Sequence, residues 1–561
     1  ANSVLALLRA VWNDSGRMSE ELLWPPNLFA STSMLLLDTG CYRATTTDDY
    51  VGGKALNRET ALAEVAHEWM TALDAFITKD DASGVRLEDC SIGEQLSYWL
   101  SLADTVTMEA LRLHGAVSQA PASSVDDFVR TTLELHATAD VACTGFGLVG
   151  SHRTSAPGAK CLGELMLTAM GTMSTLPKHF GVVLPKMRTP QSGLSLRSFS
   201  HHLAFVRTEV DVAWRVFPWV NDKENVVNVL ALPWPMRVHP RQFKPSRDSL
   251  QVVRNFEYSA PGAVDLVDSR VGGTGDDESI IAEIVARVRA AVQIVGRVHL
   301  VVLPELALRE SVFDQLLRVL PGRLHGMQGG GMPMVVSGVA AGPGQNEVHL
   351  AALFEDRWYR LKQRKHHRWK LDRNQMMQYG LQARLGTTRD TFERMEVAQR
   401  RLGVLAPTGW MALCPLICED LAQLEPVAEV IRAIGPNLLI ALLLDGPQLR
   451  ERWSARYASV MADDPGCAVL TLTAAGMARR SRRIGSAHDG GDAADSATQP
   501  VSIGLWRDPL TGWRELALPQ GDDAMLLTLS SEIRTEFTAD GRSDAGAASH
   551  IRLDGYITFG G

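Results

Sequence analysis

The chain has 561 residues, of which 45% are hydrophobic and 21% charged, and its formal net charge is −8. This length exceeds one ordinary hydrophobic core, so two or more domains are expected. The negative net charge argues against a general nucleic-acid-binding protein, and no apolar run approaches the roughly 18 residues of a membrane-spanning helix. The first residues carry neither a basic segment nor a long apolar one, so no signal peptide is expected.

Residues 1–220 are predicted to form a mostly helical domain. Apolar residues recur at helical spacing in five segments, namely 61–77, 95–113, 125–137, 162–173 and 205–216. No nucleotide-binding, zinc or repeat motif occurs there. We expect a scaffold, or an interaction surface for a protein or a nucleic acid.

The pattern changes after residue 222, where short apolar runs alternate with helical segments. Strands are predicted at 226–232, 298–303, 334–339, 347–354, 357–361, 410–417, 438–444 and 467–473. The alternation predicts a mixed sheet with packed helices. We assign a second domain to residues 222–543, with an insertion at about 237–275 and a mobile loop at about 484–499. Residues 544–561 are expected to be a C-terminal arm that packs on a neighbour.

Seven cysteines are scattered without the Cys-x-x-Cys spacing of zinc sites. Free thiols are typical of a reducing compartment. The sequence therefore predicts a cytoplasmic protein with no metal and no cofactor.

Two reactive side chains each follow an apolar segment. Glu305 comes after the run 298–303 and Pro304, and Cys418 comes directly after the run 410–417. A carboxylate removed from water has a raised pKa and suits a general base, while a thiol at a strand end faces a cleft with little freedom. Taken singly, Glu305 is better explained as a surface helix cap and Cys418 as a core thiol.

A basic stretch over residues 360–373 supplies a third group. One lysine beside the thiol would lower the thiol pKa and stabilise the oxyanion of a tetrahedral intermediate. Lys365 fits this role best, with Lys370 and Lys362 as alternatives. A solvated basic face is the simpler explanation of the stretch as a whole.

The residues that follow Lys365 are candidates for binding substrate. His366, His367 and Arg368 could recognise an anionic group such as a carboxylate or a phosphate.

A carboxylate, an ammonium and a thiol in this chain order resemble the Glu–Lys–Cys triad of the nitrilase (carbon–nitrogen hydrolase) superfamily, over roughly residues 222–535. The resemblance implies an α/β fold, in which a nitrilase-like α-β-β-α sandwich forms the C-terminal domain after a mostly α-helical N-terminal domain. It also implies a homo-oligomer.

The resemblance further implies an amidase or nitrilase that works through a thioester. Glu305 would deprotonate Cys418, which attacks an amide or nitrile carbon. Lys365 and the backbone N–H of Glu419 would hold the oxyanion. Superfamily members commonly carry a second Glu after the Lys; residues 369–376 contain none, and Asp372 is the substitute considered.

The stretches 232–235, 366–369 and 378–380 are similar to the nitrilase-like portion of bacterial antiphage proteins that join a reverse transcriptase to a nitrilase domain. No Tyr-x-Asp-Asp polymerase motif occurs in this chain. The resemblance implies a defence component without the polymerase half. The alternative to an enzyme is a catalytically silent nitrilase-like module that oligomerises and senses or binds a partner.

Overall fold

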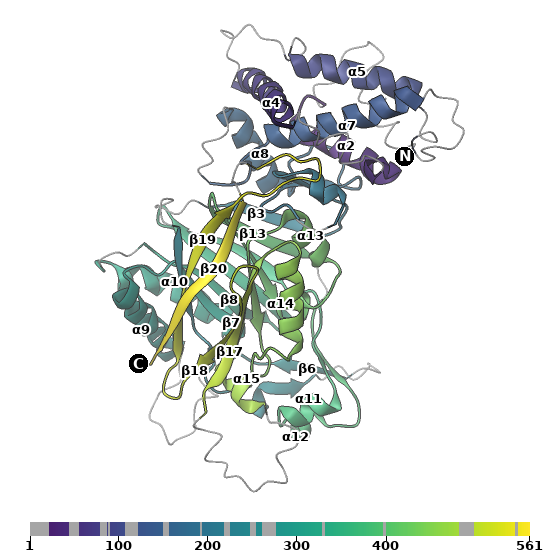
Figure 1. The fold of residues 1–561 in the computed structure, drawn as a ribbon. Coiled ribbons are helices and arrows are strands. Elements are labelled where there is room, and N and C mark those ends of the chain that lie inside the picture. The colour runs from purple at the N-terminus through teal and green to yellow at the C-terminus, as the bar shows by residue number, and fades with distance from the viewer. Residues whose placement is uncertain are drawn as a thin grey trace.

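Figure 1 shows a group of helices at one end of the molecule and a two-sheet sandwich below it. The computed structural model describes residues 22–43, 55–78, 87, 90–106, 111, 122–149, 156–190, 193–217, 225–246, 254–260, 277–327, 331–396, 400–481, 499–544 and 548–560. Both parts share one continuous hydrophobic core.

Helices dominate the N-terminal part, as the apolar spacing predicts. They are α2 (Pro25–Thr39), α4 (Ala55–Thr78), α5 (Ser91–Thr105), α7 (Ala122–Ala142) and α8 (Pro157–Met170). Helix α7 packs against α2, α4 and α5. Trp69 and Trp99 are fully buried between these helices, and the indole N–H of Trp99 donates to Thr132 Oγ1 at 2.8 Å.

The helix predicted over residues 205–216 is wrong. This segment contains the end of β2 (Leu203–Val206), which pairs with β1 (Val182–Pro185), and then β3 (Asp211–Val216). Val212 and Trp214 are buried while their neighbours are partly exposed, which is the two-residue period of a strand. Pairing of β3 in parallel with a strand of the sandwich therefore outweighs the apparent helical spacing.

Two seven-stranded sheets form the sandwich. One has the order β10 (Arg357–Arg364), β9 (Gln345–Phe354), β8 (Met334–Gly342), β7 (Leu300–Arg309), β4 (Val226–Ala231), β19 (Ala524–Arg534) and β20 (Ala548–Phe559). The other has the order β18 (Gly512–Leu518), β17 (Val501–Asp508), β16 (Ala468–Thr473), β15 (Leu438–Leu443), β14 (Met411–Ile417), β13 (Arg401–Thr408) and β3.

Helices cover the outer faces of both sheets. Helices α9 (Asp277–Val295) and α10 (Glu310–Leu324) lie on the first sheet, whereas α13 (Val427–Ile434) and α14 (Trp453–Asp463) lie on the second (Figure 1). Along β7, Leu300 and Val302 belong to the core between the sheets, and Val301 and Leu303 pack with α9 and α10. Burial on both faces explains why the strands are continuous apolar runs.

The insertion and the C-terminal residues are built into this frame. Within the insertion, β5 (Phe243–Pro245) and β6 (Arg254–Tyr258) join β12 (Thr391–Glu393) and β11 (Lys370–Leu371) in a four-stranded sheet. The predicted mobile loop lies, apart from residue 499, outside the described residues. The predicted C-terminal arm differs from the structure: strand β20 pairs with β19 of its own chain, and buried Ile551 and Leu553 hold it there.

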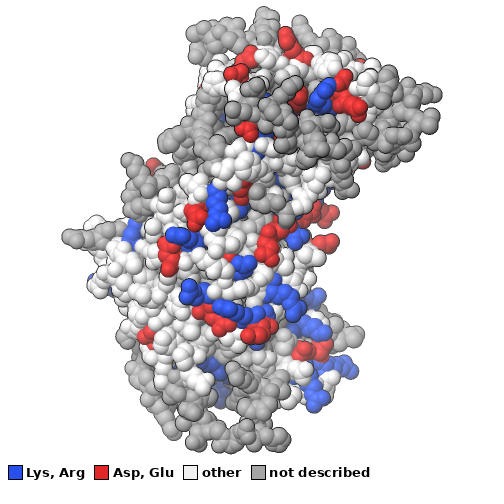
Figure 2. Space-filling view, viewed as in Figure 1, with Lys and Arg blue, Asp and Glu red and all other residues white. Residues whose placement is uncertain are grey.

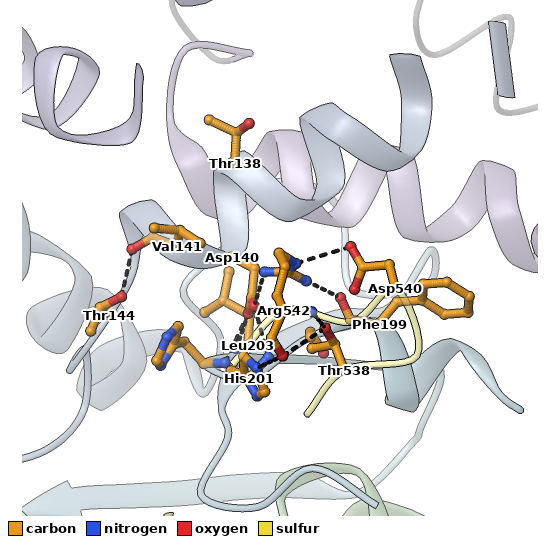
Figure 3. Close-up of polar contacts among 12 residues, drawn as sticks. Thr138, Asp140, Val141, Thr144, Phe199, His201, Leu203, Thr538, Asp540 and Arg542 are labelled. Carbon is orange, nitrogen blue, oxygen red and sulfur yellow. Dashed lines mark hydrogen bonds and ion pairs between the residues drawn. The ribbon is translucent and has the colours of Figure 1, made fainter. Parts of the chain in front are cut away.

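A buried cluster of charges joins the helical part to the sandwich (Figure 3). Arg542, from the loop between β19 and β20, donates to Asp540 at 3.0 Å, to Asp140 of α7 at 3.4 Å and to the carbonyl of Phe199 at 2.6 Å. Asp140 also accepts the backbone N–H of His201 at 2.7 Å. A charge buried this deeply needs such partners, so the loop is fixed to the helical part.

Candidate active site

Glu305 lies at an irregularity in the middle of β7. The pairing of β7 with β8 shifts between Leu303 and Leu308, and Leu306 has a left-handed backbone with φ of 51°. Gly338 of β8 faces this point, where an added Cβ would stand 2.4 Å from Glu305 Cα. The close approach requires glycine and turns the carboxylate of Glu305 into the interior, where it is buried.

Lys365 follows the last residue of β10 and is buried against two carboxylates. Its Nζ donates to Glu305 Oε1 at 2.8 Å and to Glu393 Oε2 at 2.6 Å. No part of the Lys365 side chain is exposed. The predicted pairing of a carboxylate with a lysine 60 positions later is therefore present as a buried ion pair.

The two alternative lysines lie elsewhere. Lys362 pairs with Glu310 at 2.6 Å and Lys370 with Asp390 at 2.9 Å, and about half of each lysine side chain is exposed. Neither contacts Glu305. Of the three candidate lysines, only Lys365 is placed beside the carboxylate.

Glu393 is the group that the sequence analysis missed. It ends β12 and, besides Lys365, its carboxylate accepts the backbone N–H of Trp369 at 3.0 Å. Asp372, considered as the substitute, instead accepts the N–H of Gln375 at 2.8 Å and caps a short helix. No local motif marks Glu393, because the four-stranded sheet brings it to Lys365 from 28 residues further along the chain.

Asn346 is a second residue without a sequence signal. Its side-chain amide N–H groups donate to Glu305 Oε1 at 2.7 Å and to Glu393 Oε1 at 2.8 Å, and its backbone carbonyl accepts the backbone N–H of Lys365 at 2.9 Å. One neutral amide thus bridges two carboxylates that would otherwise repel each other. Asn346 fixes the spacing of the whole buried cluster.

Cys418 begins a 3-10 turn, Cys418–Leu421, directly after β14. Its φ of 45° is unusual for a residue with a side chain, and such backbone strain often accompanies functional sites. Burial raises the pKa of the thiol well above its ordinary value, and Glu305 raises it further; Lys365 acts in the opposite direction without overcoming them. Lys365 thus lowers the thiol pKa as expected, but burial and Glu305 outweigh it and the pKa stays above its ordinary value.

The two charged groups shift each other's pKa strongly. Burial raises the pKa of Glu305, as expected from its sequence position, and Lys365 opposes this. Burial lowers the pKa of Lys365, but Glu305, Glu393 and Cys418 together raise it well above its ordinary value. Lys365 is thus held as a cation, beside a carboxylate whose proton affinity is increased.

His366 and His367 contact the 3-10 turn Cys418–Leu421. Asp420 of this turn accepts the backbone N–H of His366 at 3.0 Å, the N–H of His367 at 3.0 Å and a contact from His367 Nδ1 at 2.9 Å. These contacts connect the chain after Lys365 to the turn that carries Cys418. Arg368 is exposed. Substrate binding by these three residues stays a prediction.

Asp445 forms a further polar group on the side of β15. It accepts from Arg452 at 2.7 Å, from the indole N–H of Trp453 at 2.9 Å and from the hydroxyl of Tyr379. Burial and Asp445 raise the pKa of Tyr379 well above its ordinary value, so the phenol remains a donor. The negative charge of Asp445 also adds to the raised pKa of Cys418.

No family model and no curated protein matches this sequence. Similar solved structures include members of the nitrilase superfamily and a carbon–nitrogen hydrolase. They include an amidase from Nesterenkonia sp. (13% identity, TM-score 0.29), Nit3 of Saccharomyces cerevisiae (11%, 0.29) and a carbon–nitrogen hydrolase from Helicobacter pylori G27 (10%, 0.28). Each match covers 54% of this chain and 89% of the other chain. Identities and TM-scores this low assign no activity to this chain.

Two further properties of the protein concern metal binding and membrane-spanning helices. Within the described part of the chain, no three side chains of His, Cys, Asp or Glu are grouped so that they could hold a metal ion. None of the helices in the described ranges is long and apolar enough to cross a bilayer.

Proposed function

We propose that this protein is a carbon–nitrogen hydrolase of the amidase or nitrilase type. The observation that supports the proposal best is the buried contact of 2.8 Å between Glu305 and Lys365, in a cluster that shifts the pKa of the strained thiol of Cys418. A base, a fixed cation and a nucleophile are the three groups that acyl transfer needs.

In the first half of the proposed reaction, Glu305 takes the proton of Cys418 as the sulfur attacks the carbon of an amide or a nitrile. A neutral resting thiol requires this transfer, and the raised pKa of Glu305 favours it. For an amide, Lys365 and the backbone N–H of Glu419 stabilise the negative oxygen of the tetrahedral intermediate. For an amide, Glu305 returns the proton to the departing amine, which leaves a thioester on Cys418. A nitrile instead takes the proton on its nitrogen to give a thioimidate, and addition of one water with loss of ammonia converts this to the same thioester.

In the second half, water attacks the thioester carbon. Glu305 takes a proton from the water, and the thiolate leaves and is reprotonated as the acid departs. Glu393 and Asn346 do not exchange protons in this scheme. They hold Lys365 and Glu305 in place, because both contact these groups in the interior.

A matched pair of cysteine variants tests the proposal. The full chain is incubated with short saturated amides and nitriles, which do not alkylate the exposed thiol of Cys161 by conjugate addition. Ammonia release and the intact mass of the protein are measured. Wild type and Cys161→Ala, whose cysteine is exposed, should release ammonia and form a mass adduct, and Cys418→Ala should do neither. Full hydrolytic activity in Cys418→Ala contradicts the mechanism.

The biological setting is a separate part of the proposal. We place the hydrolase in bacterial antiphage defence, as a homo-oligomer, with the helical part as the surface for a protein or nucleic-acid partner. On the face drawn in Figure 2, acidic and basic side chains are interspersed, without an extended patch of one sign. Loss of phage protection in Cys418→Ala supports a catalytic role; retained protection favours the silent module that binds a partner.

A further inference from the structure

A cavity of about 650 Å³ lies between the helical part and α13. Its walls come from α2, from the segment that leads into β2 and from α13, and none of Glu305, Lys365 and Cys418 lines it. The volume is in the range of pockets that bind small organic molecules, roughly 300–1,000 Å³.

Positive charge predominates in the lining. Lys186, Arg197, Arg207 and Arg432 face one carboxylate, Glu429. Clustered Arg and Lys side chains around one concave space are typical of sites for phosphate groups, since a guanidinium can donate two parallel hydrogen bonds.

Lys186 is the least exposed of these cations. Its ammonium donates to the carbonyl of Ser200 at 2.6 Å, to the hydroxyl of Ser200 at 3.1 Å and to the carbonyl of Arg197. All three acceptors are neutral, and no carboxylate of the described residues lies within ion-pair distance of it. Burial lowers the pKa of Lys186 to about 7, although Asp140 and Glu536 act from further away to raise it. These acceptors use all three N–H donors of the ammonium, so Lys186 contributes positive charge near the cavity and not a hydrogen bond to a ligand.

The arginines retain donors for a ligand. Arg197 and Arg432 share one carboxylate, Asp464, at 3.1 Å and 3.6 Å, and this residue lies outside the cavity lining. Arg207 pairs with Asp38 at 2.8 Å and is half-exposed. Since each guanidinium has five N–H donors, these contacts leave several unused.

The remaining wall is apolar and includes one unsatisfied hydroxyl. Phe29, Phe205, Leu196 and Leu424 line it. Ser33 also lines the cavity; it is fully buried, and its Oγ has no hydrogen-bond partner in the described part of the protein. This hydroxyl is closed off from the cavity, so it offers a ligand no direct contact.

We infer that this cavity binds a nucleoside diphosphate or a closely similar amphipathic phosphate. The phosphates lie against the three arginines, with Lys186 adding positive charge, and the base lies against Phe205 and Leu424. Inorganic phosphate alone would leave most of the volume and the apolar wall unused. The inference goes beyond the proposed hydrolase activity and does not depend on it.

Calorimetric titration of the full chain tests the inference with three probes, namely ADP, adenosine and inorganic phosphate. ADP should bind, and adenosine and phosphate should each bind at least about tenfold more weakly, because each lacks one half of the contacts. Lys186→Met and Arg432→Gln should each weaken ADP binding by about tenfold or more. Arg360→Gln, which removes an arginine from another face of the protein, should bind ADP as the wild type does.

Two site variants are used so that the test still holds if one of them does not fold. Arg432 is partly exposed, so Arg432→Gln should keep the wild-type circular dichroism spectrum even if Lys186→Met does not fold. Failure of ADP to bind the wild type overturns the inference. Equal ADP affinity in wild type and Arg432→Gln also overturns it.

Discussion

Glu393 Oε2 lies 2.6 Å from Lys365 Nζ, whereas Glu305 Oε1 lies 2.8 Å from the same atom. The ammonium therefore has two carboxylate partners. Of these two carboxylates, Glu305 is among the main groups that raise the pKa of Cys418, and Glu393 is not. In the proposed mechanism Glu305 therefore takes the role of base, and Glu393 holds the cation.

Glu393→Gln should lower kcat by about 10²-fold with a smaller change in KM, because Lys365 loses the partner that fixes its position for the oxyanion. Steady-state kinetics on the best amide of the panel measure this. Asp372→Asn is the matched control, since Asp372 caps a helix and does not touch Lys365; its kcat should remain within about twofold of wild type. Equal losses in both variants would contradict the assignment of Glu393.

Gly338→Ala should impair both folding and catalysis. The new methyl group would stand 2.4 Å from Glu305 Cα and 2.4 Å from the carbonyl oxygen of Pro304. Relief of this overlap moves the base, with a destabilisation of about 1–3 kcal/mol. Urea unfolding and the rate of adduct formation on Cys418 measure the two effects. Gly322→Ala in α10 is the control, because nothing lies within 4 Å of its added methyl group; it should be neutral or stabilising.

The reaction of Cys418 with iodoacetamide should depend on pH as expected for a thiol with a raised pKa. Only the thiolate reacts, and burial together with Glu305 raises this pKa well above 9.0. The rate should therefore still increase as the pH rises through 9. In Glu305→Gln the midpoint should move to lower pH, because the negative charge is removed. Mass spectrometry of the labelled peptide follows the rate, and a plateau below pH 8 in wild type would disagree with the structure.

Stability should decrease as the pH falls from 6.5 towards 4. Burial lowers the pKa of His136 from 6.5 to about 4, so the unfolded chain binds more protons than the folded protein in this range. The neutral ring's contribution is fully present above pH 6.5 and is lost as the pH falls towards 4, with a magnitude on the order of a few kcal/mol.

Unfolding in urea at pH 7 and at pH 4.5 measures this decrease. His136→Gln should show a smaller loss than wild type, and His179→Gln, which removes an exposed ring, should show the same loss as wild type. If His136→Gln loses as much stability as the wild type between pH 7 and pH 4.5, His136 is not the cause of the decrease.

Some residues of the candidate site could be predicted from the sequence, and others could not. Cys418 follows the apolar strand β14, as the sequence indicates, whereas Glu305, expected at the end of a strand, lies within β7. The choice of Lys365 over its neighbours could not be predicted, since Lys362, Lys365 and Lys370 stand in one basic stretch. Burial distinguishes them, because only Lys365 faces carboxylates inside the fold.

The sequence by itself determined the alternation of strands and helices, because burial on both faces of a sheet demands continuous apolar runs such as Leu438–Leu443. Only the tertiary structure decided the partners of Lys365. Glu393 and Asn346 come from separate strands and follow no local period, since a buried charge is satisfied by whichever groups the sheets bring to it. The same reason explains β3 and β20, whose places depend on pairing with distant strands.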